Sequence, residues 1–431
     1  MPDVSHLKRL SAVKSNGGVK FLTPSAFPGS HCPLHPALAL AGNIKGLSSL
    51  VVGMPECATY SRIVLQNTQV RQGELHWMYV LDGNEVVFGC RKGLMDALQK
   101  IDQAGAKAVL LLVTCVPELI GEDIESIVRE AQPKLSARLI FVMMGHFKCN
   151  SFPSGSWKTM QAIVTLMEQR ALRPHVINVM GRSPGEKHIP MPPVLNALQQ
   201  QGFSLRCLAP GSSLEDFLEA PDAVLNLVLS PFMDLAATAM EQSFGIPAFR
   251  LHNVYDAAEI DILYAAIAKK LGIQWGNEFN REHLEVLSLQ EQVRKRLNGC
   301  RYICAHIGPV RTIPLAAYLA TMGMEPMLLH LEEFWPDDKN WAETLNALGY
   351  DPLVCHMVNS GSDAPLLESF SPDLCLGDLT GAKVRVPCVP YLSDLYGLSG
   401  YERTNSLLKK ILHTLDQPSV LDEGGARHGI A

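Results

Sequence analysis

Short apolar segments alternate with helical segments along nearly the whole chain. The segments 48–53, 108–113 and 138–143 are apolar and of strand length, and 121–130 has helical spacing with acidic residues in its first turn, where they favour a helix. Strands that alternate with helices in this way form parallel sheets covered by helices. The sequence therefore predicts an α/β fold.

The same pattern returns twice later in the chain. Each later unit has the order strand, glycine-containing loop, helix, strand, at 176–181, 193–201 and 203–208 in one and at 302–307, 312–322 and 326–331 in the other. This order is typical of a Rossmann-type module. We therefore predict three Rossmann-like domains with parallel sheets flanked by helices. They are an N-terminal domain over 1–170, a central domain with a helical connector over 171–297, and a C-terminal domain over 298–431.

Charge and hydrophobicity restrict the partners. The net charge of −6 offers no basic face for phosphate contacts, so we expect no nucleic-acid binding. The first residues are polar and lack the apolar core of a signal peptide. The best apolar segment, 108–113, is far shorter than the roughly 18 residues of a membrane span. We therefore expect a cytoplasmic protein that does not enter a membrane.

Eleven cysteines raise the question of metal binding, since the cytosol keeps thiols reduced. Cys57 and Cys115 each follow a predicted strand, and Cys32 lies in a turn-rich segment before an apolar one. The carboxyl ends of parallel strands are where such sheets build their sites, and thiolates suit iron–sulfur clusters. The alternative is a cysteine that only fills the core. No CxxC pair is present, so spacing alone leaves both interpretations open.

The sequence around these cysteines resembles the subunits of nitrogenase component 1. The segment 80–89, VLDGNEVVFG, is similar to a family stretch with an acidic residue and VFGG, and 114–124, TCVPELIGEDI, is similar to its Thr-Cys-x-x-Glu-x-Ile-Gly-Asp-Asp motif. Glu122 replaces the first Asp of that motif, and 54–57, MPEC, lies where the family has a Gly-Cys turn. Weaker similarities at 242–247, 371–378 and 400–402 extend the resemblance over nearly the whole chain.

The resemblance implies a set of metal ligands in the N-terminal domain. In the family, two subunits share an 8Fe–7S P-cluster at their interface, and each gives three cysteines. The corresponding residues are Cys32, Cys57 and Cys115, whose separations of 25 and 58 residues match the K-type β subunit better than the D-type α subunit. Cys149 would be an additional or redox-dependent ligand, or a strand-end cysteine without metal. A 4Fe–4S cluster is the alternative cofactor.

Two departures separate the chain from the D-type subunit. That subunit holds its catalytic cofactor by a cysteine in the central domain and a histidine in the third. Here the aligned position in 227–232 is Ser230, and 390–396 contains no histidine. The resemblance therefore implies no catalytic or cofactor-binding residue in this chain. Four histidines beside apolar strands are expected to be structural: His146, His306, His330 and His356.

The other cysteines are expected to pack in the core. They are Cys207, Cys300, Cys304, Cys355, Cys375 and Cys388. Cys90 is predicted at the N-terminus of a helix, where the helix dipole could make a thiol reactive, but packing is the better explanation for it too.

The function implied by the resemblance is electron relay. The chain would be the β-type subunit of a nitrogenase-like reductase, paired with a D-type subunit in an α2β2 assembly. It has no P-loop, so ATP chemistry would belong to a separate iron protein that supplies electrons. Methylthio-alkane reductase, which cleaves carbon–sulfur bonds, is the first choice. The alternatives are a cofactor-assembly scaffold, a tetrapyrrole reductase subunit, and a cluster-free sugar- or metal-binding module.

Overall fold

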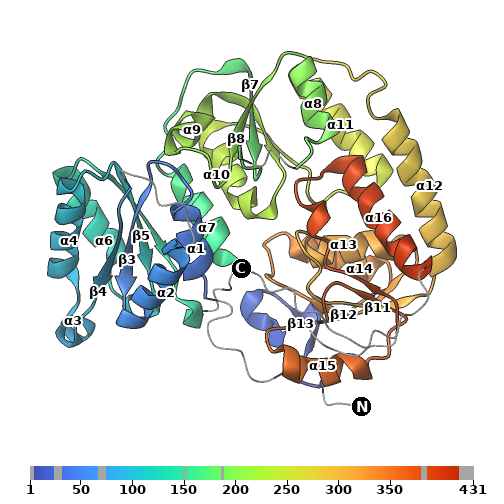
Figure 1. Ribbon diagram of the computed structural model, residues 1–431, viewed down its shortest axis with the longest axis horizontal. Helices are drawn as coiled ribbons and strands as arrows, with labels where there is room; N and C mark the ends of the chain where they lie inside the picture. Colours follow the sequence, from blue (N-terminus) through green and yellow to red (C-terminus); the bar gives the residue numbers. More distant parts are fainter. Residues whose placement is uncertain are drawn as a thin grey trace.

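The structure is a computed structural model that describes residues 4–23, 32–66, 74–148, 151, 153–185, 189–379 and 386–416. The chain forms three units, each built on its own sheet (Figure 1). Strands and helices alternate in each of them, and this confirms the predicted α/β class with parallel sheets flanked by helices. None of the described helices combines the length and the apolar character needed to cross a membrane.

The first unit contains a sheet of four parallel strands in the order β4-β3-β5-β6. Its strands are β3 (Ser48–Gly53), β4 (His76–Val80), β5 (Ala108–Val113) and β6 (Arg138–Met143). The central strands β3 and β5 are buried along their whole length, because helices cover both faces of the sheet. This burial explains why β5 is a continuous run of apolar residues.

Helices cover the two faces of this sheet (Figure 1). The helices of the first unit are α1 (Leu34–Ala41), α2 (Pro55–Gln66), α3 (Gly83–Phe88), α4 (Arg91–Gln103), α5 (Cys115–Leu119), α6 (Ile124–Ala131) and α7 (Ser154–Val164). Side chains of α1 and α7 pack against Val51 and Leu110, whereas those of α4 and α6 pack against Leu50 and Val109. Neighbouring residues of each strand thus point to opposite cores.

The second unit is a sheet of four parallel strands in the order β10-β9-β7-β8. Its elements are β7 (Arg173–Met180), α8 (Pro193–Gln200), β8 (Ser204–Leu208), α9 (Leu214–Glu219), β9 (Ala223–Val228), α10 (Asp234–Phe244), β10 (Ala248–Arg250) and α11 (Ala257–Leu271). Helix α10 packs against α7, and Met240 shares a core with Met160 of the first unit. The first two units are therefore joined through buried apolar side chains.

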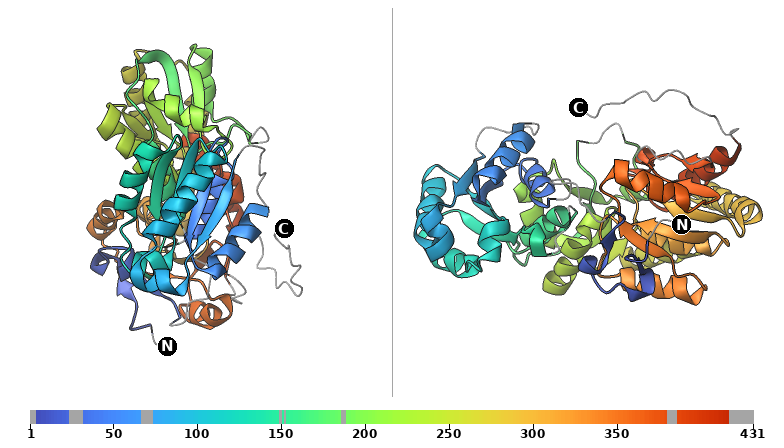
Figure 2. Two further views of the ribbon diagram at one scale, coloured as in Figure 1. Left: turned by 90° about the vertical axis from the view of Figure 1, so that its left-hand side faces the viewer. Right: turned by 90° about the horizontal axis from the view of Figure 1, so that it is seen from below.

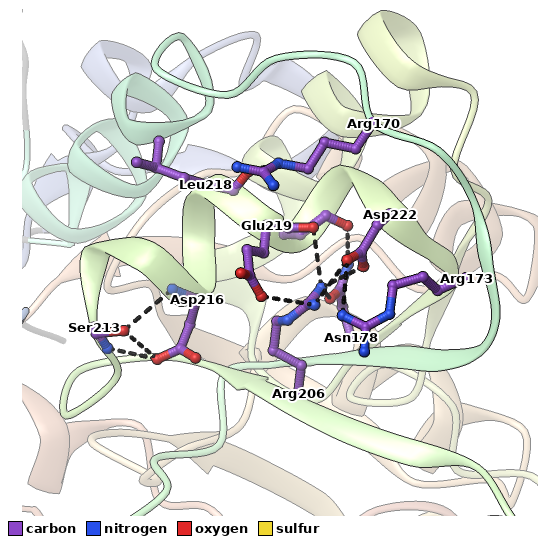
Figure 3. Close-up of polar contacts among 10 residues, drawn as sticks. Arg170, Arg173, Asn178, Arg206, Ser213, Asp216, Leu218, Glu219 and Asp222 are labelled. Atoms are coloured by element: carbon purple, nitrogen blue, oxygen red, sulfur yellow. Dashed lines mark hydrogen bonds and ion pairs between the residues drawn. The ribbon is translucent and has the colours of Figure 1, made fainter.

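A buried arginine ties the strands of the second unit to α9 (Figure 3). The guanidinium of Arg206, on β8, donates to both carboxylate oxygens of Asp222, at 2.7 and 3.1 Å. The same group donates to the backbone carbonyl of Glu219 at 3.1 Å, and Arg173 approaches Asp222 at 3.4 Å. At the start of α9, Ser213 and Asp216 cap each other's backbone N–H groups. The polar groups at this edge of the unit are thus paired locally.

The third unit has the largest sheet, with the order β1-β13-β12-β11-β14-β15 and β2 also paired to β13. Its elements are β11 (Arg301–Cys304), α13 (Thr312–Ala320), β12 (Glu325–His330), α14 (Asp338–Ala347), β13 (Leu353–His356), α15 (Ser360–Ser369), β14 (Leu374–Leu376), β15 (Cys388–Val389) and α16 (Gly400–Asp416). Helix α12 (Asn280–Leu297), from the predicted connector, packs against α16. Figure 2 shows the first and third units on opposite sides of the molecule.

Two early strands, β1 and β2, belong to the sheet of the third unit, which the sequence did not predict. Strand β1 (Lys8–Arg9) pairs antiparallel with β13, and β2 (Lys20–Phe21) pairs parallel with the same strand. The divisions at 170 and 297 stay a prediction, but the segment up to Phe21 belongs to the third sheet rather than to the N-terminal domain. Figure 1 shows this segment, in dark blue, beside the orange strands.

Candidate metal centre

Three predicted ligands meet at the carboxyl edge of the first sheet. Cys57 lies in the first turn of α2, directly after β3, and Cys115 is the first residue of α5, directly after the neighbouring strand β5. Cys32 precedes α1, which packs against α2. Burial raises the pKa of Cys32 to about 11, and the thiols of Cys115 and Cys57 add to that rise. The three sulfurs are therefore close enough to interact electrostatically.

A glycine allows Cys32 to reach this position. Helix α7 crosses the segment before α1 so closely that a Cβ at Gly155 would lie 1.9 Å from the backbone oxygen of Pro33. Only a residue without a side chain fits there. The contact fixes the backbone next to Cys32 against α7, and thereby against the same sheet that carries the other two cysteines.

The sulfur of Cys115 is surrounded by hydrogen-bond donors. Its Sγ lies 3.2 Å from Nδ1 of His146, and the backbone N–H groups of His146 and Phe147 also donate to it. Burial raises the pKa of the Cys115 thiol, while these N–H groups oppose the rise. His146 begins the short helix after β6, so a third neighbouring strand contributes to the site. N–H donors to sulfur stabilise a thiolate and tune a bound cluster.

A buried carboxylate positions the loop that carries His146. Glu118, in α5, accepts a hydrogen bond from the backbone N–H of Gly145 at 2.5 Å. A Cβ at Gly145 would lie 2.4 Å from Oε2 of Glu118 and 3.3 Å from Cα of Cys115, so the loop and α5 are in direct contact. Lys158 of α7 is held nearby by the backbone oxygen of Met143, at 3.2 Å, and its pKa is lowered by burial.

The three thiols lie too far apart to bind one metal ion together. Among the described residues, only one group of three His, Cys, Asp or Glu side chains has all its ligand atoms within 4.8 Å of one another, and it contains no cysteine. At least two of the three sulfurs are therefore separated by more than 4.8 Å. Sulfurs that bind one tetrahedral ion at about 2.3 Å lie closer together than that limit. Three interacting thiols at wider separation, with N–H donors beside one of them, fit an iron–sulfur cluster.

Large apolar side chains are exposed on α2 and α5, which carry cysteines, on the segment that follows β6, and on α3, whose end is hydrogen-bonded through Cys90 to Glu122 just after α5. Phe88 at the end of α3 is 85% exposed, and Phe147 beside His146 is 63% exposed. The others are Ile63 of α2, Val87 of α3, and Leu119 and Ile120 at the end of α5. We call these six residues the apolar rim. Large apolar side chains that stay exposed on a single chain are typical of surfaces that a partner protein covers.

The fourth predicted ligand, Cys149, lies outside the described residues. Of the cysteines predicted to pack, Cys90, Cys304, Cys355 and Cys375 are buried, and Cys207 and Cys300 are half-buried. The prediction was wrong for Cys388, which is exposed because β15 is the edge strand of its sheet. For Cys90, burial raises the pKa to about 12, and the neighbouring carboxylate of Glu122 adds to the rise, so the thiol is inert.

Two histidines form a cluster with a glutamate in the third unit. Glu332 lies 3.0 Å from His306 and 3.2 Å from His330, and these are the three side chains with ligand atoms within 4.8 Å. The backbone N–H of Met357 donates to Nδ1 of His330 at 2.9 Å, so a neutral ring carries its proton on Nε2. That nitrogen then lacks the lone pair that a metal needs. The group is a hydrogen-bonded cluster around Glu332, which local sequence does not reveal because His306 follows β11, whereas His330 ends β12 and Glu332 follows it.

The region aligned with the D-type cofactor ligands is crossed by ion pairs. Ser230 follows β9, and Asp234 begins the next helix, α10. The buried Arg311 donates to both oxygens of Asp337 at 2.8 and 2.7 Å and to Asp338 at 2.5 Å, and lies 3.8 Å from Asp234. The structure describes all of the residues 390–396, and none of them is a histidine. Carboxylates from the second and third units thus neutralise the arginine between them.

The fold and this site define the chain as a three-unit α/β protein with three cysteines at one edge of its first sheet. A family model for nitrogenase component 1 type oxidoreductases matches residues 32–416. The chain belongs to this family.

Relatives of known role are similar over most of the chain. The nitrogenase iron–molybdenum cofactor biosynthesis protein NifE of Nostoc is 26% identical over 353 residues, which cover 78% of this chain and 72% of the relative. The NifE protein of Clostridium pasteurianum is 26% identical over 351 residues, with 78% and 75% covered. A solved structure of nitrogenase Cp1 at pH 6.5 superposes with a TM-score of 0.65 at 17% identity, covering 90% of this chain and 93% of the other. That likeness concerns the fold.

Proposed function

We propose that this chain is the β-type subunit of a nitrogenase-like reductase. It holds a P-cluster-type iron–sulfur cluster at the interface with a D-type subunit, in an α2β2 assembly. There it relays electrons from an ATP-dependent iron protein to the cofactor of its partner. The observation that carries the proposal is the meeting of Cys32, Cys57 and Cys115 at one edge of a sheet, beside the apolar rim.

The residues of this chain have distinct tasks in such a site. Cys32, Cys57 and Cys115 supply the thiolates, and the N–H groups around Cys115 stabilise negative charge on its sulfur. A bound iron–sulfur cluster supplies one-electron chemistry, and its potential depends on hydrogen bonds to sulfur and on burial. The apolar rim then excludes water when a partner subunit covers it. Cys149 is proposed as a further, redox-dependent ligand.

The absence of the D-type ligands supports relay rather than catalysis. Ser230 stands where that subunit has its cysteine, and Arg311 is already neutralised by aspartates. Substrate reduction would therefore occur on the partner. Reductive cleavage of a carbon–sulfur bond, as in methylthio-alkane reductase, is the reaction we favour.

The test uses the complex purified without oxygen. Cys115→Ala should lose iron and the paramagnetic signals of the cluster, while the matched substitution Cys300→Ala, at another half-buried cysteine, should keep both. About eight irons per pair of subunits supports the P-cluster type, and about four indicates a 4Fe–4S cluster. Unchanged iron content and turnover in the Cys115 variant would overturn the proposal. An unchanged spectrum of Cys149→Ala in both redox states would remove Cys149 from the ligand set.

A second candidate function is favoured by the relatives themselves. Six of them are cofactor biosynthesis proteins. On this alternative the chain is half of a scaffold on which a cofactor matures before transfer. The two functions differ in a direct assay, because a relay subunit supports repeated turnover with the iron protein. A scaffold instead passes its cluster to an acceptor protein and shows no turnover.

A further inference from the structure

Two cysteines lie opposite each other at the edge of the third sheet. Strands β14 and β15 pair in parallel, and Cys375 is the direct partner of Cys388 in that register. Paired residues of neighbouring strands project from the same face of a sheet. Cys375 is buried in a core with Ile303 and Leu328, whereas Cys388 is the one exposed residue among the ten cysteines that the structure describes.

The two thiols are neighbours in the strand register and interact. This interaction raises the pKa of Cys375 and lowers the pKa of Cys388, whose S–H donates to the backbone oxygen of Val386 at 3.5 Å. Cys388 is the exposed member of the pair, so a small disulfide can reach its sulfur first, and the attacking form is the thiolate. The buried Cys375 is its direct partner in the register, in the place of a resolving cysteine.

The backbone geometry suits a covalent link. Neighbouring strands are separated by about 4.8 Å, and disulfides join Cα atoms about 4.4 to 6.8 Å apart. The Cβ atoms must approach to about 3.8 Å, a movement of about 1 Å. Strand β15 has only two residues and no further neighbour in the described sheet, so it can make this movement more readily than a central strand.

We propose that Cys375 and Cys388 form a redox-active dithiol, which low-molecular-weight disulfides such as oxidised glutathione convert to an intramolecular disulfide. The Cys388 thiolate attacks one sulfur of the small disulfide, forms a mixed disulfide and releases one thiolate. Cys375 then loses its proton to that thiolate and attacks the Cys388 sulfur, which releases the second thiolate. Two protein thiols are oxidised by two electrons, and one small disulfide is reduced to two thiols.

The consequence of oxidation is local. A disulfide would fasten β15 to β14, and β15 leads through the short helix Ser393–Leu395 to α16. Backbone atoms of Leu392, just before that helix, contact the loop at Gly308, so the link would stiffen the carboxyl edge of the third sheet. This inference is independent of the metal centre, which lies in the first unit.

The experiment titrates the anaerobic full-length protein with glutathione redox buffers. Free thiols are then alkylated, and the peptides are analysed by mass spectrometry without reduction. We expect a peptide pair cross-linked through Cys375 and Cys388, which a dithiol reductant separates. Cys375→Ser should stop at a glutathione adduct on Cys388, Cys388→Ser should form neither product, and Cys300→Ser should behave as the parent protein.

Two results would overturn the inference. In one, the parent protein accumulates the glutathione adduct on Cys388 without the cross-link. In the other, Cys388 reacts no faster than Cys300 with an alkylating reagent at neutral pH. In a Cys375→Ala protein the alkylation of Cys388 should become several-fold slower, because the interaction with Cys375 that lowers the Cys388 pKa is lost. This rate does not depend on disulfide formation, so it tests the contact separately.

Discussion

Buried charges in this chain are paired by side chains from nearby elements. Arg206 and Asp222 have side chains that are 10% and 6% exposed, and they form a two-point contact. Arg311, with a side chain 4% exposed, is matched by Asp337 and Asp338. Since an unpaired buried charge is costly, each of these residues depends strongly on its partner.

Removing Asp222 should destabilise the second unit. Asp222→Ala removes the two-point partner of the buried Arg206 guanidinium and leaves it the more distant Glu219 carboxylate, at 3.4 Å, so we expect the free energy of unfolding to fall by up to about 3–5 kcal/mol. Urea denaturation measures this change. The control is Glu125→Ala, which breaks a pair with side chains 75% and 66% exposed and should change stability by about 0.5 kcal/mol or less. Equal losses in the two variants would contradict the expected dependence on burial.

His306 should make stability depend on pH. Burial lowers the pKa of His306, but hydrogen bonding to Glu332 and to the backbone of Met357 outweighs it and raises the pKa above 6.5. A raised pKa stabilises the fold fully below the unfolded value and loses that effect as pH rises through the folded value. His306→Gln should therefore lower the melting temperature most below about pH 6.5, with a smaller difference at pH 8.5. In a Glu332→Gln background this pH dependence should be much reduced.

The sequence pointed to individual candidate ligands better than to their surroundings. Cys57 and Cys115 could be selected because each directly follows an apolar strand, and Cys32 because a family resemblance included it. His146 was expected to be structural, since the pairing of β5 with β6 that brings it to Cys115 is not visible in local sequence. Cys388 was expected in the core because its neighbours are apolar, but an edge strand leaves one side uncovered.

Helix α7 packs against the segment that carries Cys32 and against the sheet that carries the other candidate ligands. It contacts α1, β6 and α10, and its side chain Lys158 lies close to Glu118 and Glu333, from the first and third units. Burial raises the pKa of Glu333 to about 8, and Lys158 partly opposes this rise. The position of α7 therefore affects all three units and the segment that carries Cys32.

A methyl group at Gly155 should disturb the site without touching a thiol. In Gly155→Ala the new Cβ would lie 1.9 Å from the Pro33 oxygen, so α7 and the start of α1 must separate. We expect a lower iron content in the purified complex and a loss of stability. The control Gly361→Ala adds the same methyl group within α15, where no atom lies within 4 Å, and should leave iron content unchanged. Full iron content in both variants would show that Cys32 does not require this contact.

The apolar strands of the first sheet were the easiest elements to predict. Strands β3, β5 and β6 have the predicted bounds, because strands that helices cover consist largely of apolar residues. Strand β11 ends at Cys304 rather than Ile307, since His306 instead forms a bridge to Asp378. The two-residue strands β1 and β2 have no such pattern, and only their pairing with β13 makes them strands.

At the scale of the molecule, the N-terminal segment is part of the third unit. Leu7 and Leu22 are buried in a core with Ile303 and Cys355, and Leu10 is buried in a second core of the same unit. Asp351, just before β13, accepts hydrogen bonds from the backbone and hydroxyl groups of Ser11. The segment therefore contributes both apolar and polar contacts to a sheet formed mainly by the end of the chain.

Truncating one of these N-terminal side chains should destabilise the third unit, although most of that unit lies far away in the sequence. Leu22→Ala removes a fully buried side chain, and we expect a loss of about 2–5 kcal/mol. Hydrogen exchange should accelerate in β12 and β13 before β3 and β5. Leu172→Ala, at a side chain 60% exposed, is the control and should change little. Faster exchange confined to the first unit would contradict the assignment of this segment to the third sheet.

The pairing of β1 and β2 with β13 determines when the third sheet can form during translation. A ribosome releases Lys8 and Phe21 long before it adds Leu353, so the first strands of the protein emerge without their neighbour. The first and second sheets are complete in the nascent chain before that neighbour exists, because all their strands precede it. The third sheet can close only after β13 has been synthesised, and until then the leading segment must stay unpaired or be shielded by a chaperone.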